Sequence, residues 1–130
     1  AEVRLPKAEP LTMGVFTGDA VDSAMLWGRK TFDAIVTDAP YGVVHGSHSG
    51  TTRRRSPTEL LGEAIPVWAG QLRHGGALGM SWNTLGLSRE HLVATLSAAG
   101  LTPLDDDLWR QFSHRVDSAI HRDLIVAVKA

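Results

Sequence analysis

Hydrophobic and polar residues alternate along this chain in blocks that predict strands and helices in turn. The apolar run of residues 33–40, DAIVTDAP, is almost continuous and ends at a proline, as is typical of a parallel strand with both faces covered. Residues 12–17, TMGVFT, and residues 77–83, ALGMSWN, predict two further strands. Because helical patterns separate these runs, the sequence favours an α/β fold with a parallel sheet.

Helical spacing and helix-end signals predict three helices. Residues 22–30, DSAMLWGRK, have apolar residues at helical spacing. A second helix is expected to begin after Ser56, its N-cap, because a proline and then a glutamate follow at positions that favour a helix start. It is expected to continue through Leu72 and to end at the glycine pair 75–76. The third is predicted over residues 88–100, from a serine N-cap to a terminal glycine.

The end of the chain predicts two more strands. They cover residues 107–116, DLWRQFSHRV, and residues 122–130, RDLIVAVKA. We expect these strands to pair as an antiparallel hairpin at the end of the sheet. The chain contains no internal repeat and no linker that would divide it, so the sequence predicts a single domain.

Composition narrows the range of functions. The chain has 130 residues, of which 43% are hydrophobic and 21% are charged, as is typical of one globular domain. A formal charge of -1 gives no overall attraction to nucleic acid, so such binding would need a local basic patch. The absence of cysteine excludes disulfides and thiolate catalysis, and it favours a cytoplasmic location. No apolar run reaches the ~20 residues of a membrane span, so no membrane partner is expected.

Polar residues lie at the ends of three predicted strands. Asp19 follows the first strand, Asp38 ends the second, and residues 81–83, Ser-Trp-Asn, end the third. Ligands of open α/β sheets bind in the crevice outside the carboxyl ends of the strands. We therefore expect these residues to gather at one edge of the sheet and to form a ligand site.

Residues 38–41, Asp-Ala-Pro-Tyr, have the chemistry needed to hold a nucleobase amine. The lone pair of such an amine is delocalised into the ring, so an enzyme that uses it as a nucleophile needs acceptors that orient its N–H bonds. The Asp38 carboxylate and the Ala39 carbonyl supply two acceptors, and Pro40 restrains the backbone around them. Tyr41 offers a flat face on which a flipped base can stack.

Residues 38–42, Asp-Ala-Pro-Tyr-Gly, resemble the Asp-Pro-Pro-Tyr signature of S-adenosylmethionine-dependent amino-methyltransferases. Residues 18–20, Gly-Asp-Ala, resemble the strand end at which that family contacts the cofactor adenine. Residues 114–130 are similar to the terminal hairpin of tRNA guanine-N2 methyltransferases. The resemblance implies S-adenosylmethionine as cofactor. It also implies a partial Rossmann-like class I methyltransferase sheet, built from the family's later strands with an antiparallel C-terminal hairpin.

The resemblance also assigns roles to individual residues. Four residues form the expected catalytic group: Asp38, Ala39, Pro40 and Tyr41. Three are expected to contact the cofactor: Asp19, Ala20 and Asp38. Five are expected to contact the nucleic acid, the arginines through its phosphates: Tyr41, Gly42, Arg53, Arg54 and Arg55. No metal site is expected, because His45 and His48 lie in a Gly-Ser loop without a third ligand at suitable spacing.

The sequence departs from the family pattern in two places. Ala39 replaces the usual first proline, which keeps the carbonyl but restrains it less. The larger departure is that no Gly-rich loop follows a first strand to hold the methionine end of the cofactor. We therefore expect residues 1–130 to be the C-terminal portion of a methyltransferase-like catalytic domain, completed by an upstream segment or by a second chain.

The predicted reaction is methyl transfer to an exocyclic amino nitrogen of a nucleobase, with N2 of guanine in tRNA as the favoured target and RNA as the partner. One alternative is a DNA N6-adenine or N4-cytosine methyltransferase. Another is a non-catalytic methyltransferase-like module that binds RNA or a protein partner, which the missing glycine loop would favour. The enzyme and the module differ in one expectation, since only the enzyme should lose its function when Asp38 is replaced.

Overall fold

The computed structural model describes residues 2–3, 11–14, 18–39 and 56–130 of the chain. In chain order, its elements are β1 (Glu2–Val3), β2 (Leu11–Thr12), the 3-10 helix η1 (Ala20–Asp22), α1 (Ser23–Trp27), β3 (Phe32–Asp38), α2 (Pro57–Gln71), β4 (Leu72–Asn83), α3 (Arg89–Ala98), β5 (Leu101–Pro103), the 3-10 helix η2 (Asp107–Arg110), β6 (His114–Asp117) and β7 (Ile120–Lys129). None of the helices in these ranges combines the length and the apolar composition that crossing a bilayer requires.

Five strands form one mixed, open sheet. Its order is β3-β4-β7-β5, and β6 pairs with β7 outside this path. β3 and β4 are parallel and are connected through α2, whereas β7 runs antiparallel to β4, β5 and β6. The α/β class and the antiparallel terminal hairpin predicted from the sequence are therefore confirmed. The sheet is mixed rather than parallel, because β7 lies between β4 and β5 and runs against both.

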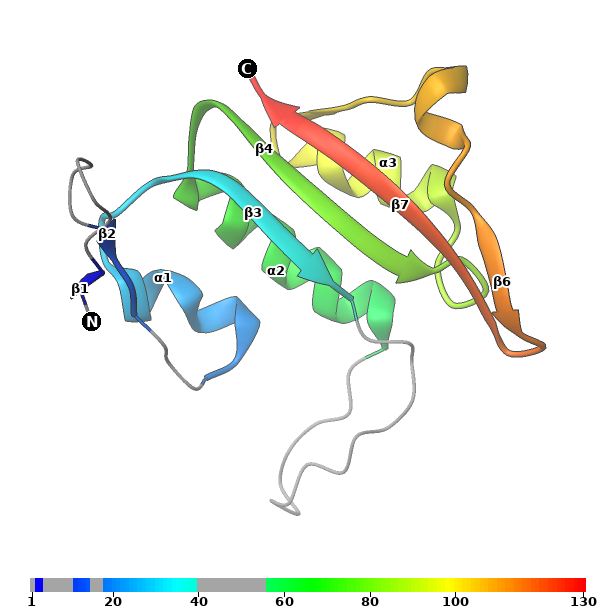
Figure 1. Ribbon diagram of the computed structural model, residues 1–130, viewed down its shortest axis with the longest axis horizontal. Coiled ribbons are helices and arrows are strands. Elements are labelled where there is room, and N and C mark those ends of the chain that lie inside the picture. The colour runs from blue at the N-terminus through cyan, green and yellow to red at the C-terminus, as the bar shows by residue number, and fades with distance from the viewer. Residues whose placement is uncertain (1, 4–10, 15–17, 40–55) are drawn as a thin grey trace, which may run out of the picture.

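The hydrophobic core lies between the sheet and the helices α2 and α3, which Figure 1 shows behind the strands. Alternate residues of β4 are buried in this layer, as the period of two in a strand requires. Nine large side chains are almost completely inaccessible: Leu61, Ile65, Leu72, Leu78, Met80, Trp82, Leu92, Leu96 and Ile125. They come from β4, β7, α2 and α3, so this single layer joins the sheet to both helices.

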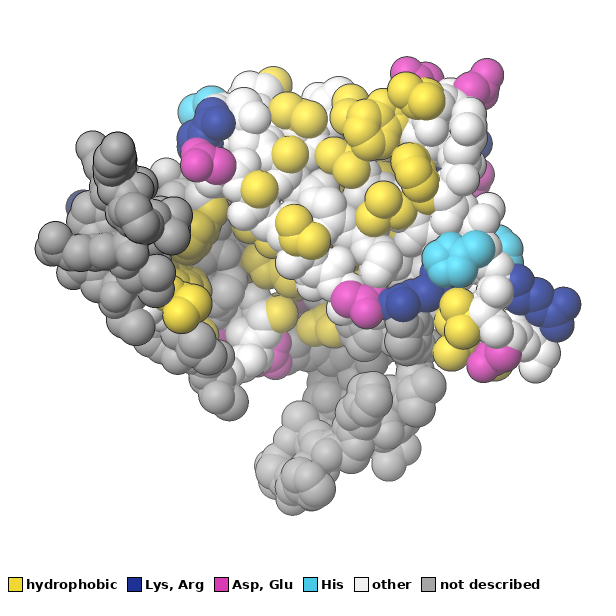
Figure 2. All heavy atoms as spheres, viewed as in Figure 1, with side chains coloured by type: hydrophobic (Ala, Val, Ile, Leu, Met, Phe, Trp, Pro, Cys, Tyr) yellow, Lys and Arg dark blue, Asp and Glu magenta, His cyan; other side chains and the backbone are white. Residues whose placement is uncertain are grey.

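The opposite side of the sheet, which we call the open face, carries apolar residues at the molecular surface. Val36 of β3 pairs with Gly79 of β4, which pairs in turn with Val126 of β7, so these three residues share that face. Val36 is 86% exposed, and Figure 2 shows hydrophobic side chains spread over this side of the molecule. Parallel strands usually occur in sheets with both faces covered. The described elements therefore leave the open face uncovered around Val36.

Within the described residues, the strand predicted over residues 12–17 is confirmed at Thr12 and is wrong at residues 13–14. The strand observed there, β2, is Leu11–Thr12, and it pairs antiparallel with β1 in a separate two-stranded sheet. Residues 13–14 belong to no strand, and residues 15–17 lie outside the described residues. The β-leaning composition of this segment therefore did not determine where its strand lies.

The C-terminal end of α2 differs from the prediction. The helix ends at Gln71, and Leu72 already belongs to β4, where it pairs with Phe32 of β3. The Lys129 ammonium group reaches from β7 and donates to the carbonyls of Ala69 and Leu72 at 2.7 and 2.8 Å. A helix end leaves such carbonyls without helical partners. A residue 57 positions after Leu72 therefore completes this helix end.

The glycine pair that was expected to stop α2 lies inside β4 instead. Gly75 has a φ of 83°, which other residues rarely adopt. A Cβ atom on Gly76 would lie 3.0 Å from the carbonyl oxygen of Asp33 on β3. The register of β3 against β4 shifts between Phe32 and Ala34, beside this contact. The two glycines therefore permit the close approach of β3 and β4 at an irregular point of their pairing.

The segment before β6 is helical rather than extended. The strand predicted over residues 107–116 is wrong in its first part, because Asp107–Arg110 form η2 and β6 begins at His114. The Asp106 carboxylate caps η2 by accepting from the Trp109 N–H at 3.4 Å. β5 was not predicted, because its three residues are too few for a recognisable strand pattern.

Serine N-caps begin both long helices, as predicted. The Oγ atoms of Ser56 and Ser88 accept from the N–H groups of Glu59 and His91, each at 3.1 Å. We expect Ser56→Ala or Ser88→Ala to lower the free energy of unfolding by about 1 kcal/mol, because each leaves a helical N–H without its partner. Ser97→Ala, near the end of α3, is the control and should change it by less than about 0.5 kcal/mol. Urea unfolding followed by tryptophan fluorescence measures these losses, and equal losses at all three serines would contradict the capping role.

Candidate functional site

Asp38 ends β3 and is bonded to side chains from two other strands. The Ser81 hydroxyl on β4 donates to Oδ1 of Asp38 at 2.6 Å. The Arg122 guanidinium on β7 donates to the same oxygen through Nη2 and forms an ion pair with it. Within the described residues, Oδ2 receives no hydrogen bond, and the Asp38 side chain is 60% exposed. Among the described residues, no donor therefore competes for this oxygen.

Arg122 reaches Asp38 because β7 runs antiparallel to β4. Arg122 pairs with Asn83, the last residue of β4, at the edge where β3 and β4 have their carboxyl ends. Its side chain is only 23% exposed. Arg122 is not among the site residues predicted from the sequence. The signal that could have found it is the basic residue at the start of the predicted last strand, which an antiparallel hairpin brings to this edge.

The surroundings of Asp38 favour its ionised form. The hydrogen bond from Arg122 and then that from Ser81 hold the pKa of the Asp38 carboxyl below its ordinary value, against the opposing effect of burial. At neutral pH the carboxylate is therefore a hydrogen-bond acceptor only. One of its oxygens is held by the protein and the other can accept an N–H bond from a ligand.

Ala39 continues the strand pairing beyond Asp38. Its N–H donates to the Ser81 carbonyl at 2.8 Å, and the residue is buried in the core. The Ala39 side chain is therefore committed to packing, and any contact with a ligand would come from its backbone. The other predicted residues of this motif and its loop lie outside the described residues: Pro40, Tyr41, Gly42, His45, His48, Arg53, Arg54 and Arg55.

Asp19 and Ala20 lie at the start of η1. The Asp19 carboxylate is the N-cap and accepts from the Val21 N–H at 3.1 Å. η1 contacts α2, whereas Asp38 is bonded to β4 and β7. Of the three polar strand ends expected to gather, the structure thus joins Asp38 to Ser81 and leaves Asp19 with other contacts. The cofactor role of Asp19 and Ala20 stays a prediction.

Trp82, which follows Ser81 at the carboxyl end of β4, is a core residue, as is usual for an aromatic residue of a strand. Its side chain is buried between the sheet and the helices, and its Nε1 donates to the Leu87 carbonyl at 2.8 Å. The alternation of β4 sends Ser81 and Trp82 to opposite faces of the sheet. Ser81 therefore belongs to the site and Trp82 does not.

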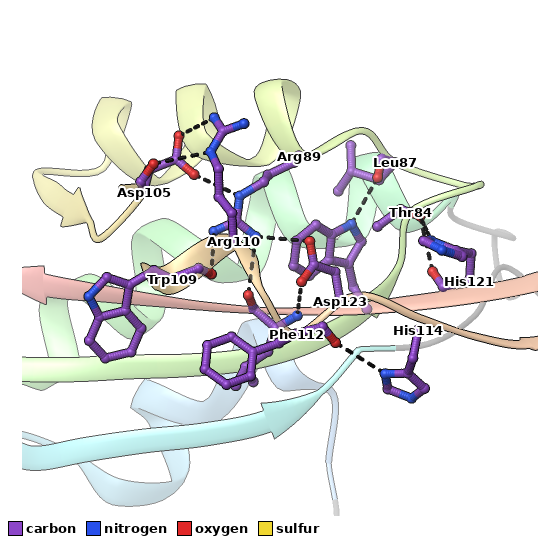
Figure 3. Close-up of polar contacts among 12 residues, drawn as sticks. Thr84, Leu87, Arg89, Asp105, Trp109, Arg110, Phe112, His114, His121 and Asp123 are labelled. Atoms are coloured by element: carbon purple, nitrogen blue, oxygen red, sulfur yellow. Dashed lines mark hydrogen bonds and ion pairs between the residues drawn. The ribbon is translucent and has the colours of Figure 1, made fainter. Parts of the chain in front are cut away.

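Asn83 and Thr84 hold the terminal hairpin against the end of β4. The Asn83 side chain accepts from the His121 N–H at 3.0 Å and donates to the Ala119 carbonyl at 3.1 Å. The Thr84 hydroxyl donates to the His121 carbonyl at 3.0 Å and lies 2.9 Å from Nδ1 of the same histidine, as Figure 3 shows. These bonds fix the start of β7 and with it the position of Arg122.

A buried ion network holds β7 against α3. Arg89, the first residue of α3, is 8% exposed, and it donates to Asp105 at 2.6 Å and to Asp123 at 3.0 Å. Figure 3 shows the Arg89 guanidinium reaching toward both carboxylates, with Arg110 also bonded to Asp105. Asp123 follows Arg122 in the chain. The network therefore anchors the part of β7 that carries the candidate site.

The fold and this geometry define an α/β protein with an exposed, ionised acceptor at the carboxyl edge of its sheet, where ligands of such sheets bind. No protein-family model matches the sequence, and no curated protein matches it either. The function is therefore inferred from the residues of the site and from the motif that Asp38 begins.

Proposed function

We propose that this protein is an enzyme of S-adenosylmethionine-dependent methyl transfer to an exocyclic amino nitrogen of a nucleobase, with N2 of a tRNA guanine as the favoured target. The observation that carries the proposal is the position of Asp38. This residue begins the Asp-Ala-Pro-Tyr-Gly motif and ends β3 at the edge where ligands bind. Its exposed carboxylate has an oxygen that can accept an amine N–H bond.

The residues of the motif orient the amine. Asp38 accepts one N–H bond through Oδ2, the Ala39 carbonyl accepts the other, and Tyr41 stacks on the base. With both N–H bonds held, the nitrogen lone pair points along the line of attack, and positioning of this kind is most of what the displacement needs. Bound S-adenosylmethionine supplies an activated methyl group. Asp38 and the Ala39 carbonyl would hold the amine nitrogen in line with that group, and the methylated nitrogen would then release its extra proton to solvent.

We propose that one part of the cofactor site lies at the start of η1. Asp19 and Ala20 would hold the cofactor adenine, and a carboxylate such as Asp19 can accept more than one hydrogen bond. The Gly-rich loop that would hold the methionine end is missing from the sequence. The proposal therefore includes an upstream segment or a second chain that supplies this loop.

The arrangement of the strands is compatible with the later half of a methyltransferase sheet. β3 and β4 are parallel, and the antiparallel β7 follows them in the sheet. The open face around Val36 would be covered by further elements in a complete domain. We therefore propose that residues 1–130 are the C-terminal portion of a catalytic domain that acts on RNA in the cytoplasm.

Calorimetric titration of S-adenosylhomocysteine tests the proposal. We expect no binding to residues 1–130 alone and binding to a form extended upstream, because the missing loop should complete the cofactor pocket. Binding by the short chain would contradict the C-terminal-portion hypothesis. If neither form binds S-adenosylhomocysteine, the result would contradict the proposed enzymatic function. It would favour the non-catalytic module, which the missing loop also supports.

The same titration tests the cofactor role of Asp19. In the extended form, Asp19→Ala should weaken binding roughly 10- to 100-fold, because a hydrogen bond to a charged acceptor contributes about 1.5–3 kcal/mol. Asp22→Ala is the matched control, since Asp22 is an exposed aspartate on the same η1 helix. Equal effects of the two substitutions would count against a contact between Asp19 and the cofactor.

A further inference from the structure

We propose that Arg122 is a positioning residue which, together with Ser81, holds the Asp38 carboxylate so that Oδ2 faces the target amine. The inference rests on the proposed function and deepens it, because it assigns the geometry of the acceptor to a residue outside the motif. Arg122 lies 84 positions from Asp38 in the sequence and reaches it across β4.

Two donors from different strands act on one oxygen of Asp38. Ser81 donates from β4 at 2.6 Å, and Arg122 donates from β7, both to Oδ1. A carboxylate held by a single bond can turn about its Cβ–Cγ bond, whereas two donors from separate strands oppose that rotation. The direction of Oδ2 is therefore set by the sheet. Acceptors that orient a nucleophile act through such fixed geometry.

Arg122 is itself held in place by its strand. Its backbone pairs with Asn83 on one side and with His114 on the other. The next residue, Asp123, is bonded to Arg89 in the buried ion network. The Arg122 side chain is 23% exposed, against 54% for Arg73, which forms an exposed ion pair elsewhere in the sheet. The guanidinium is thus more restricted than that of an ordinary surface arginine.

The charge of Arg122 also keeps Asp38 ionised. Within the described residues, the groups that surround this carboxylate are Arg122 from β7 and Ser81 from β4, with His114 of β6 next to Arg122 in the register. Arg122 has the largest effect in lowering the pKa of the Asp38 carboxyl. Its removal should therefore raise that pKa, so that Asp38 takes up a proton at a higher pH and loses its acceptor character earlier on acidification.

A carbon-13 NMR titration of the Asp38 carboxyl in this chain tests the inference directly. Arg122→Gln should raise the Asp38 pKa toward the ordinary value of about 3.9. In Arg122→Lys the Asp38 pKa should stay lower than in Arg122→Gln, because lysine keeps the positive charge but lacks the guanidinium geometry. Ser81→Ala should raise the pKa by a smaller amount. Arg73→Gln is the matched control and should leave Asp38 unchanged.

An unchanged Asp38 pKa in Arg122→Gln would overturn the inference whether or not the protein is a methyltransferase. A change that Arg73→Gln reproduces would overturn it as well. Because Arg122 is partly buried, each variant is first compared with the parent by thermal unfolding. Ser81→Ala is a second test, because the Asp38 pKa must also rise in this variant if the two donors act together.

Methyl transfer to tRNA by the form extended upstream separates the inference from the proposed function. Arg122→Gln should lower kcat roughly 10- to 100-fold with a smaller change in KM, and Arg122→Lys should recover part of the loss. An active parent with an equally active Arg122→Gln would overturn the positioning role alone. An inactive parent would overturn the proposed function, while the NMR titration would still decide whether Arg122 holds Asp38.

Discussion

Replacement of Asp38 by alanine should lower kcat for methyl transfer by about 100-fold or more, because the target amine loses the acceptor that orients its lone pair. The substitution removes one small exposed side chain, so tRNA binding should be retained. Transfer of a radiolabelled methyl group to tRNA, with the protein extended upstream, measures kcat. A filter-binding assay with the same RNA measures affinity. The combination of lost turnover and retained binding is what distinguishes the enzyme from a binding module.

Asp33→Ala is the matched control for this experiment. Asp33 is another exposed aspartate on β3, with a side chain 83% exposed and an ion pair to Arg73. It lies near the opposite end of the strand from Asp38, so its loss should leave kcat unchanged. Full activity of Asp38→Ala would contradict the proposed function and favour the non-catalytic module. An equal loss in both variants would show a general effect of charge rather than a role of Asp38.

The second large effect is expected on stability. Arg89→Ala should lower the free energy of unfolding by about 3–5 kcal/mol, because it leaves the buried Asp123 carboxylate without its partner. Asp123 and Arg89 are both almost inaccessible to solvent. A domain of this size has a stability of roughly 5–15 kcal/mol, so the loss is a large share of the total. Urea unfolding followed by tryptophan fluorescence measures it.

Two further variants show whether the loss of stability comes from the unpaired buried carboxylate or from the loss of an ion pair as such. Arg110→Ala removes the exposed partner of Asp105 and should leave the free energy of unfolding nearly unchanged, because exposed ion pairs contribute little. The double replacement Arg89→Met with Asp123→Leu should be far milder than Arg89→Ala, because no buried charge remains unpaired. A double variant as unstable as Arg89→Ala would show that packing of the arginine, and not the unpaired carboxylate, causes the loss.

The sequence by itself determined those features that depend on residues within a few positions of each other. Ser56 and Ser88 begin their helices because each bonds an N–H three residues away. The pattern of residues 77–83 predicted the later part of β4, since period-two burial is a property of any strand. The apolar run of residues 33–40, which ends at a proline, likewise predicted that Asp38 would lie at the carboxyl end of a strand.

Only the tertiary structure decided which distant residues complete these elements. Lys129 caps the end of α2 and Arg122 bonds Asp38 because β7 inserts beside β4 and runs antiparallel to it. The place of β7 in the sheet follows from the packing of the whole core layer. No local sequence pattern predicts a contact between residues 84 positions apart. The ion pair between Arg122 and Asp38 is therefore known only from the folded chain.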